Sequence, residues 1–284
     1  MEWENLQAGQ TWAEANLEKD WNAASLCCAY ANAGASFLEM RRQPPIQWFK
    51  TGLSAAKRMQ DPKEEIEQLR LLGNAFLDLG ELNEALDCFE QALEIAREVE
   101  ALEEEAVILN RLGLCHEMME DYPLAIDCHE KTLAIHQENE DRPKQRIALI
   151  RLANSYEPGG NLQKAAEFYE QALEISRETG DQRGERKDLA ALGEICAKLD
   201  NHYRAMGFFE QSLRLSKETG NRLDEANDLW RISLALEKLG DRNQAIKRGE
   251  AALKVFKRAK HPDAKMVRAK LSEWEKIGKN RDEG

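Results

Sequence analysis

The residues best suited to metal chemistry lie close together in the middle of the chain. They are Cys115, His116, Cys128, His129 and His136. Zinc sites in proteins use thiolate and imidazole ligands of this kind, and four ligands must converge on one ion. A metal-assisted enzyme is therefore one hypothesis. It depends on whether the surrounding elements bring these side chains together.

A repeat of 40 residues defines those elements. Leucine recurs at this interval from Leu69 to Leu229, and alanine recurs from Ala85 to Ala245, with no gap in the register. The position of Gly73 stays small in the other units, where it holds Gly113, Ala153, Gly193 and Ser233. Self-similarity at a fixed interval is the signature of a repeat architecture.

Each unit predicts two amphipathic helices joined by a tight turn. Leu69, Leu72 and Phe76 follow the three-and-four spacing of one helical face. After a turn at residues 80–82, a second helical face is marked by Ala85, Phe89, Ala92, Leu93 and Ala96. One helix pair cannot bury its apolar face alone, so neighbouring pairs must stack. The sequence therefore predicts an all-α fold, an α-solenoid of stacked antiparallel helix pairs.

The repeat also gives the histidines a structural interpretation. His116 occupies the position that Phe76 and Tyr156 hold in other units, and His129 occupies the position of Phe89. Both histidines replace aromatic residues of the predicted core, so they are expected to pack near each other where two helices meet. We expect a buried histidine pair rather than a metal site, no cofactor, and no enzymatic activity.

The repeated units resemble the tetratricopeptide repeat (TPR) family. The resemblance rests on the small residues Gly73 and Ala85, the aromatic residues Phe76 and Phe89, and Ala92. The interval of 40 residues is similar to that of the long-helix subclass found in kinesin light chains and Pins-type spindle-orientation proteins. The resemblance implies a right-handed TPR superhelix that serves as a protein-binding scaffold.

The repeats divide the chain into three expected parts. Residues 1–64 should form N-terminal helices with a degenerate zeroth repeat, and residues 65–260 should form five TPR units. Residues 261–284 should form a C-terminal capping helix and tail, because a repeat array needs a polar cap. Four tryptophans precede the repeats and are expected to form the core of the N-terminal cap: Trp3, Trp12, Trp21 and Trp48.

The N-terminal stretch carries a second resemblance. Trp3, Asn5, Leu6 and Trp12, followed by "FLEMRRQPPIQWFKTGL", are similar to the junction that leads into the TPR sensor of STAND-class signalling NTPases. The sequence contains no GxxxxGK[ST] phosphate-binding motif. The alternative that this resemblance implies is a ligand-sensing or autoinhibitory TPR fragment of a larger STAND-type signalling ATPase.

In TPR proteins the first helix of each unit lines the concave wall. The family's wall positions lie two and three residues before the small glycine and one residue after it. The corresponding residues that we take as candidate peptide-binding residues are Arg70, Asn74, Asn110, Arg111, Leu114, Arg151, Asn154, Trp230 and Arg231. Asparagine can pair with the backbone of an extended peptide, and arginine binds carboxylates with two hydrogen bonds.

Two interpretations of this wall stay open. In the first, the chain is an interaction module that holds an extended, acidic segment of another protein or peptide in the concave TPR groove. In the second, Arg111 and Arg151 are structural and bond to neighbouring acidic helices.

The composition limits the partners and the location. A formal net charge of −12 argues against a general nucleic-acid binder. No apolar run approaches the roughly 20 residues that span a bilayer, and the N-terminus lacks a signal-peptide pattern. Six cysteines without CxxC spacing indicate a reducing compartment, so we expect a cytoplasmic protein without membrane contact. Residues 245–284 carry 12 basic and 6 acidic side chains, which we interpret as a solvated helical face.

Overall fold

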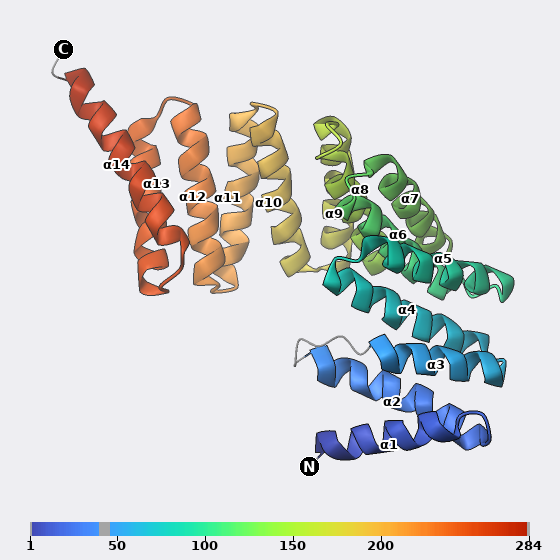
Figure 1. Ribbon diagram of the computed structural model, residues 1–284. Coiled ribbons are helices and arrows are strands. Elements are labelled where there is room, and N and C mark those ends of the chain that lie inside the picture. Colours follow the sequence, from blue (N-terminus) through green and yellow to red (C-terminus); the bar gives the residue numbers. More distant parts are fainter. Residues whose placement is uncertain (1, 40–45, 283–284) are drawn as a thin grey trace. The chain divides into compact units, whose positions relative to one another are not determined.

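The computed structural model describes residues 2–39 and 46–282, and its regular elements there are all helices (Figure 1). The expected all-α class is confirmed. The chain divides into two compact units, Met1–Asp141 and Arg142–Gly284. None of the described helices is long and apolar enough to cross a membrane.

The first unit stacks seven helices in chain order. They are α1 (Glu2–Asn16), α2 (Trp21–Glu39), α3 (Ile46–Met59), α4 (Pro62–Leu79), α5 (Leu82–Glu98), α6 (Leu102–Met118) and α7 (Tyr122–Glu138). Each helix packs on the next, and α4 also contacts α2 and α6. The contacts between α2, α4 and α6 place the first helix of each pair on one common side of the stack.

The second unit repeats this arrangement. Its helices are α8 (Arg142–Tyr156), α9 (Leu162–Thr179), α10 (Gln182–Lys198), α11 (His202–Glu218), α12 (Arg222–Lys238), α13 (Arg242–Arg258) and α14 (Asp263–Asp282). Consecutive helices pack against each other from α8 to α14. The repeated leucines Leu149, Leu189 and Leu229 are all buried.

The helix ends recur every 20 residues because each turn uses the same backbone conformation. A residue with positive φ lies at Gln60, Gly80, Glu100, Glu120, Glu140, Gly160, Gly180, Asp200, Gly220, Gly240 and Lys260. Glycine adopts this left-handed conformation without strain, whereas other residues are destabilised there. An Asp or Asn then caps several of the following helices: the Asp181 carboxylate accepts a hydrogen bond from the Gly184 amide, and Asn201 accepts one from Arg204.

The small position packs beneath a ring of the second helix in the units that carry Gly73 and Gly193. A Cβ added at Gly73 would lie 2.6 Å from the Phe89 ring, and one added at Gly193 would lie 2.3 Å from Phe209. A Cβ at either glycine would collide with the ring. These glycines therefore set how closely the two helices of their pairs can pack.

The N-terminal tryptophans are a correction. Trp12 and Trp21 are 51% and 64% exposed, so the prediction that they form the core of the N-terminal cap is wrong for both. The core between α1, α2 and α3 is instead built from small side chains: Ala13, Ala24, Cys27, Cys28, Ala55 and Ala56. Helices packed through such short side chains leave no space for an indole. The side chain of Trp3 and residues 40–45 of the N-terminal motif lie outside the described residues.

The stacked arrangement predicts different costs for the same truncation at different places. Leu152 is fully buried in the middle of the repeats, so Leu152→Ala should lower the free energy of unfolding by about 2 to 5 kcal/mol. Leu253 lies in α13 near the end of the stack and is 9% exposed, so Leu253→Ala should cost less. Denaturant unfolding of both variants measures the difference, and equal losses would contradict the stacked arrangement.

The turns predict opposite effects for two glycine-to-alanine changes. Gly180 has φ +69, so Gly180→Ala should destabilise the fold by about 1 kcal/mol. Gly207 lies inside α11, and a Cβ added there would meet nothing within 4 Å. Gly207→Ala should therefore stabilise the fold by about 0.5 to 1 kcal/mol. Thermal unfolding of the two variants provides the comparison; a shift of both in the same direction would show that backbone strain does not control the turns.

Candidate functional site

The candidate wall residues all lie on the first helices of the helix pairs. Helices α4 and α6 carry them in the first unit, and α8 and α12 carry them in the second.

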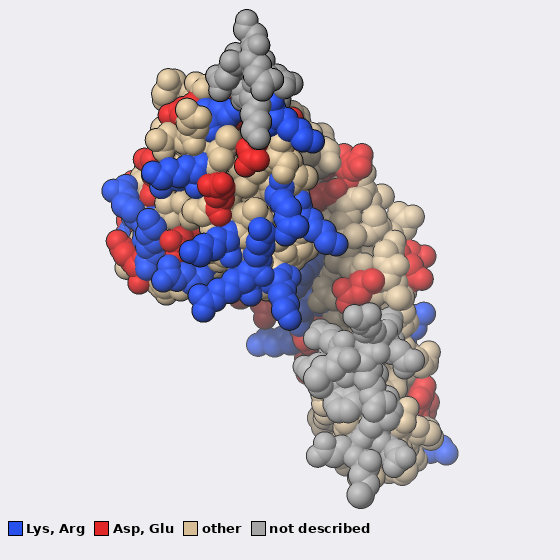
Figure 2. Space-filling model, turned by 90° about the vertical axis from the view of Figure 1, so that its left-hand side faces the viewer, with Lys and Arg blue, Asp and Glu red and all other residues tan. Residues whose placement is uncertain are grey.

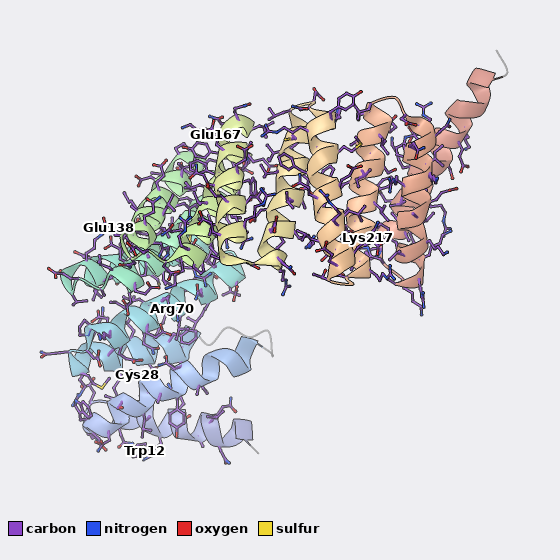
Figure 3. All side chains as sticks on the ribbon, turned by 180° about the vertical axis from the view of Figure 1, so that it is seen from behind. Trp12, Cys28, Arg70, Glu138, Glu167 and Lys217 are labelled. Carbon is purple, nitrogen blue, oxygen red and sulfur yellow. The ribbon has the colours of Figure 1, made fainter. Side chains whose placement is uncertain are left out.

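In the first unit, Arg70 lies on α4 (Figure 3). Its guanidinium binds the Glu67 carboxylate with two hydrogen bonds, of 2.5 Å and 2.9 Å. Glu67 and Arg70 also border a pocket of about 430 Å³ between α4 and α6, whose other polar residues are Lys63, Glu103 and Glu104. Carboxylates outnumber cations in this pocket, so its charge does not favour an acidic ligand.

The other wall residues of this unit are partly buried. Asn110, Arg111 and Leu114 are half-buried on α6. The Oδ1 atom of Asn74, on α4, is buried without a hydrogen-bond partner. An unsatisfied amide oxygen of this kind can accept a hydrogen bond from a ligand backbone, although it is only narrowly accessible.

In the second unit, Asn154 is already engaged within the fold. Its Oδ1 accepts a hydrogen bond of 2.5 Å from the Tyr169 hydroxyl. Burial raises the pKa of Tyr169 to about 12, so this hydroxyl stays protonated and can donate. Arg151, three residues earlier on α8, is half-buried. The amide group of Asn154 is thus held in one orientation.

The larger pocket of the second unit lies between α10 and α12. Its volume is about 540 Å³, and an apolar surface is provided by Ala197, Phe209, Leu234 and Ala235. The charged side chains around this surface are Glu194, Lys198, Arg231, Glu237, Lys238 and Lys270. Cations outnumber carboxylates by four to two. This pocket therefore combines an apolar surface with a positive surround, which the first unit's pocket lacks.

Arg231 is fixed in this pocket by two carboxylates. Its guanidinium lies 2.6 Å from Glu194 Oε1 and 3.4 Å from Asp228 Oδ1. Asp228 is fully buried and accepts a hydrogen bond of 2.7 Å from the Ser216 hydroxyl. Burial raises the pKa of Asp228, while the hydroxyl groups of Ser216 and Ser212 and the charge of Arg231 oppose that shift. Arg231 is therefore structural on one side and lines the pocket on the other.

The lysines around the pocket differ in how they are held. Lys198 pairs with Glu157, the residue directly after α8, and Lys270 lies 3.1 Å from Glu273 within α14. No ion-pair partner for Lys238 is found among residues 46–276, and its side chain is exposed. Lys238 is thus the cation most available to a ligand. The wall positions used in the sequence analysis do not include Lys198, Lys238 or Lys270, because these residues lie one helical turn beyond those positions or on the terminal helix.

Trp230 does not belong to the wall. It is buried and stacks on Trp274 of α14, with ring centroids 5.9 Å apart. The fifth unit has Gly249 where the other units have an aromatic residue or histidine, and a Cβ at Gly249 would lie 3.4 Å from Trp230. Trp230 therefore turns inward to fill the space that a ring at position 249 would occupy, and the capping helix supplies its stacking partner.

The cysteine and histidine cluster is built as core. His129 is fully buried, with its Nε2 3.4 Å from Glu117 Oε1, and a Cβ at Gly113 would lie 2.4 Å from its ring. Burial raises the pKa of the Cys115 and Cys128 thiols to about 11. In the described part of the chain, no three His, Cys, Asp or Glu side chains are grouped so that they could hold a metal ion.

Comparison with known proteins gives the family of these repeats. The family model described as tetratricopeptide repeat matches residues 64–138 and 104–178. Comparison with curated protein sequences gave no match.

Solved structures share the fold at low sequence identity. A signal transduction ATPase with numerous domains (STAND) that has a tetratricopeptide repeat sensor, from Pyrococcus horikoshii, aligns with a TM-score of 0.73 at 16% identity, over 94% of this chain and 41% of that one. A putative kinesin light chain protein with TPR-like repeats from Podosopora anserina aligns with a TM-score of 0.61 at 17% identity, over 68% and 96%. A Rap protein complexed with competence and sporulation factor aligns with a TM-score of 0.57 at 12% identity, over 89% and 76%.

The family model thus covers residues 64–178, and the fold repeats the same helix pairs beyond them.

Proposed function

We propose that this protein-interaction module binds an acidic peptide segment in the pocket between α10 and α12. The observation that carries the proposal is the excess of cations around an apolar surface. An acidic residue of the peptide would pair with Lys238 and Lys198, and an adjacent apolar side chain would cover Phe209 and Leu234. Charged hydrogen bonds contribute more than neutral ones, and the apolar contact adds affinity that is less sensitive to salt.

The rest of the candidate wall contributes to this proposal unequally. Arg231 would bind a ligand carboxylate only if its guanidinium donated hydrogen bonds to that carboxylate and to Glu194 at the same time. Arg151 and Asn154 of α8 would extend the contact along the peptide backbone. In the first unit, Asn74, Asn110, Arg111 and Leu114 remain candidates, but the carboxylates near Arg70 favour a segment of different charge there.

A proposed interaction of this kind also has a structural precedent in the fold. The Rap protein that shares the fold is, by its description, complexed with a competence and sporulation factor. The precedent concerns that protein; for the present chain, the charge and the apolar surface of the pocket support the proposal.

Reversal of two pocket charges tests the proposal. The full chain is used to select binders from a random peptide library, and the affinity of a selected peptide is then measured by fluorescence anisotropy. Selected peptides should be rich in Asp and Glu beside an apolar residue. Lys198→Glu with Lys238→Glu should weaken their binding at least about tenfold, which corresponds to about 1.4 kcal/mol.

Lys254→Glu with Arg258→Glu is the matched control. Both residues are exposed on α13, do not line the pocket, and change the net charge by the same amount. This control should leave peptide affinity nearly unchanged. Peptides without acidic residues, or an equal loss of affinity in both double variants, would reject the pocket as the acidic-peptide site.

A second candidate function is that of a sensor in a larger signalling ATPase. We propose it on one observation, the alignment of 94% of this chain with the STAND protein that has a tetratricopeptide repeat sensor. The natural gene decides between the two. An in-frame segment upstream of Met1 that encodes a GxxxxGK[ST] motif would support the sensor, and a stop codon in frame directly before Met1 would reject it.

A further inference from the structure

The charge on the outward face of the second helices changes from negative on α5 to positive on α13. On α5, the exposed residues Asp87, Glu94 and Glu98 form one line, because intervals of seven and four residues return to the same side of a helix. Asp87 and Glu98 are 11 positions apart, or about 16 Å at a rise of 1.5 Å per residue. These three carboxylates have no ion-pair partner in the described chain, and we call them the acidic stripe.

Helix α13 carries the opposite charges at the same positions of its own unit. Steps of 40 residues lead from the acidic stripe to Lys247, Lys254 and Arg258. All three are exposed, and no ion pair of theirs is found within residues 46–276. We call them the basic stripe. Figure 2 shows the Lys and Arg side chains gathered over α13 and α14.

The two stripes match in spacing because both are built on the same repeat. A parallel arrangement of an α5 and an α13 helix would put all three pairs of opposite charge face to face. An antiparallel arrangement would do so for the outer two pairs. Opposite charges placed at matching intervals attract in either orientation, so the complementarity does not depend on one exact geometry.

The net charges of the regions around the two stripes also favour attraction between the stripes. Asp and Glu outnumber Lys and Arg by 18 in residues 1–141, whereas Lys and Arg outnumber Asp and Glu by 6 in residues 245–284. An acidic first unit repels nucleic acid and anionic membranes, but it attracts the basic end of another copy of the same chain. Met266 is the single large apolar side chain strongly exposed among the described residues of α13 and α14, so the surface has little to insert into a bilayer.

We propose that the basic stripe of α13 docks on the acidic stripe of α5 in a second copy of this chain. The contact is heterologous, joining two different surfaces, so it extends into chains of copies or closes into a ring. Exposed ion pairs are individually weak and are screened by salt. The association is therefore reversible and confined to low ionic strength.

Sedimentation velocity of the full chain tests the proposal. In about 20 mM salt, where screening acts only beyond about 20 Å, the sedimentation coefficient should rise with protein concentration. In about 0.5 M salt, where charges further apart than about 4 Å are screened, the chain should sediment as a monomer at every concentration.

Two charge reversals make the test specific. Glu94→Lys with Glu98→Lys leaves both stripes basic, and Lys254→Glu with Arg258→Glu leaves both stripes acidic. Each variant alone should lose at least about tenfold in self-association. An equal mixture should restore the association, because each variant then meets a partner of opposite charge. A folding defect cannot produce such a rescue.

The pocket variant Lys198→Glu with Lys238→Glu is the matched control and should associate like the wild type. The proposal is overturned if the wild-type chain stays monomeric in low salt, or if mixing the two stripe variants restores nothing. In either case, salt-sensitive binding of a labelled DNA duplex that Lys254→Glu with Arg258→Glu abolishes would assign the basic stripe to nucleic acid instead.

Discussion

The close packing of a small residue against a ring is the constraint on which the rest of the structure depends. At Gly73, Gly113 and Gly193, the ring of the second helix takes the space that a Cβ on the first helix would fill. The contact fixes the separation of the two helices, because a larger residue would force them apart and a smaller ring would leave a void. Helix pairs of equal thickness can then stack at equal intervals, which is why a residue 40 positions further along the chain meets a similar environment.

In the fifth pair, the space that a ring of the second helix fills in other pairs is filled by side chains from other helices. Gly249 removes the usual ring, and the space is closed by Trp230 from α12 and Leu271 from α14. Trp230 and Leu271 are both buried, and Trp274 stacks on Trp230. The capping helix therefore completes the last core in addition to covering it. The periodic pattern shows that the ring is missing at position 249, but it could not show which side chains close the space, because Leu271 and Trp274 lie in a helix outside the repeat.

The fold followed from the sequence because its determinants are local and periodic. Leu69, Leu152 and Ala85 are buried as the 40-residue interval predicts, since each lies on the apolar stripe of its own helix. The candidate site was less predictable. Whether Arg231 faces a ligand depends on Glu194 and Asp228, and only the packed structure brings these three side chains together. Exposure of Trp12 was missed for the same reason, because the small residues that exclude it come from three different helices.

Buried carboxylates distinguish the second unit from the first. Asp188 and Asp228, one repeat apart, each accept a hydrogen bond from a serine of the preceding helix, at 2.6 Å and 2.7 Å. Arg146 binds Asp188 with two hydrogen bonds of 2.8 Å, whereas Asp228 shares Arg231 with the pocket. A buried carboxylate is costly unless it is fully paired, so the side chain that pairs with it is held in place. The guanidinium of Arg231 is thus oriented by the core of the repeat, and the same packing that stabilises the stack presents a positive group to the pocket. The repeated helix pairs place side chains at equivalent positions, and the exposed charged side chains at those positions determine which ligands each surface attracts.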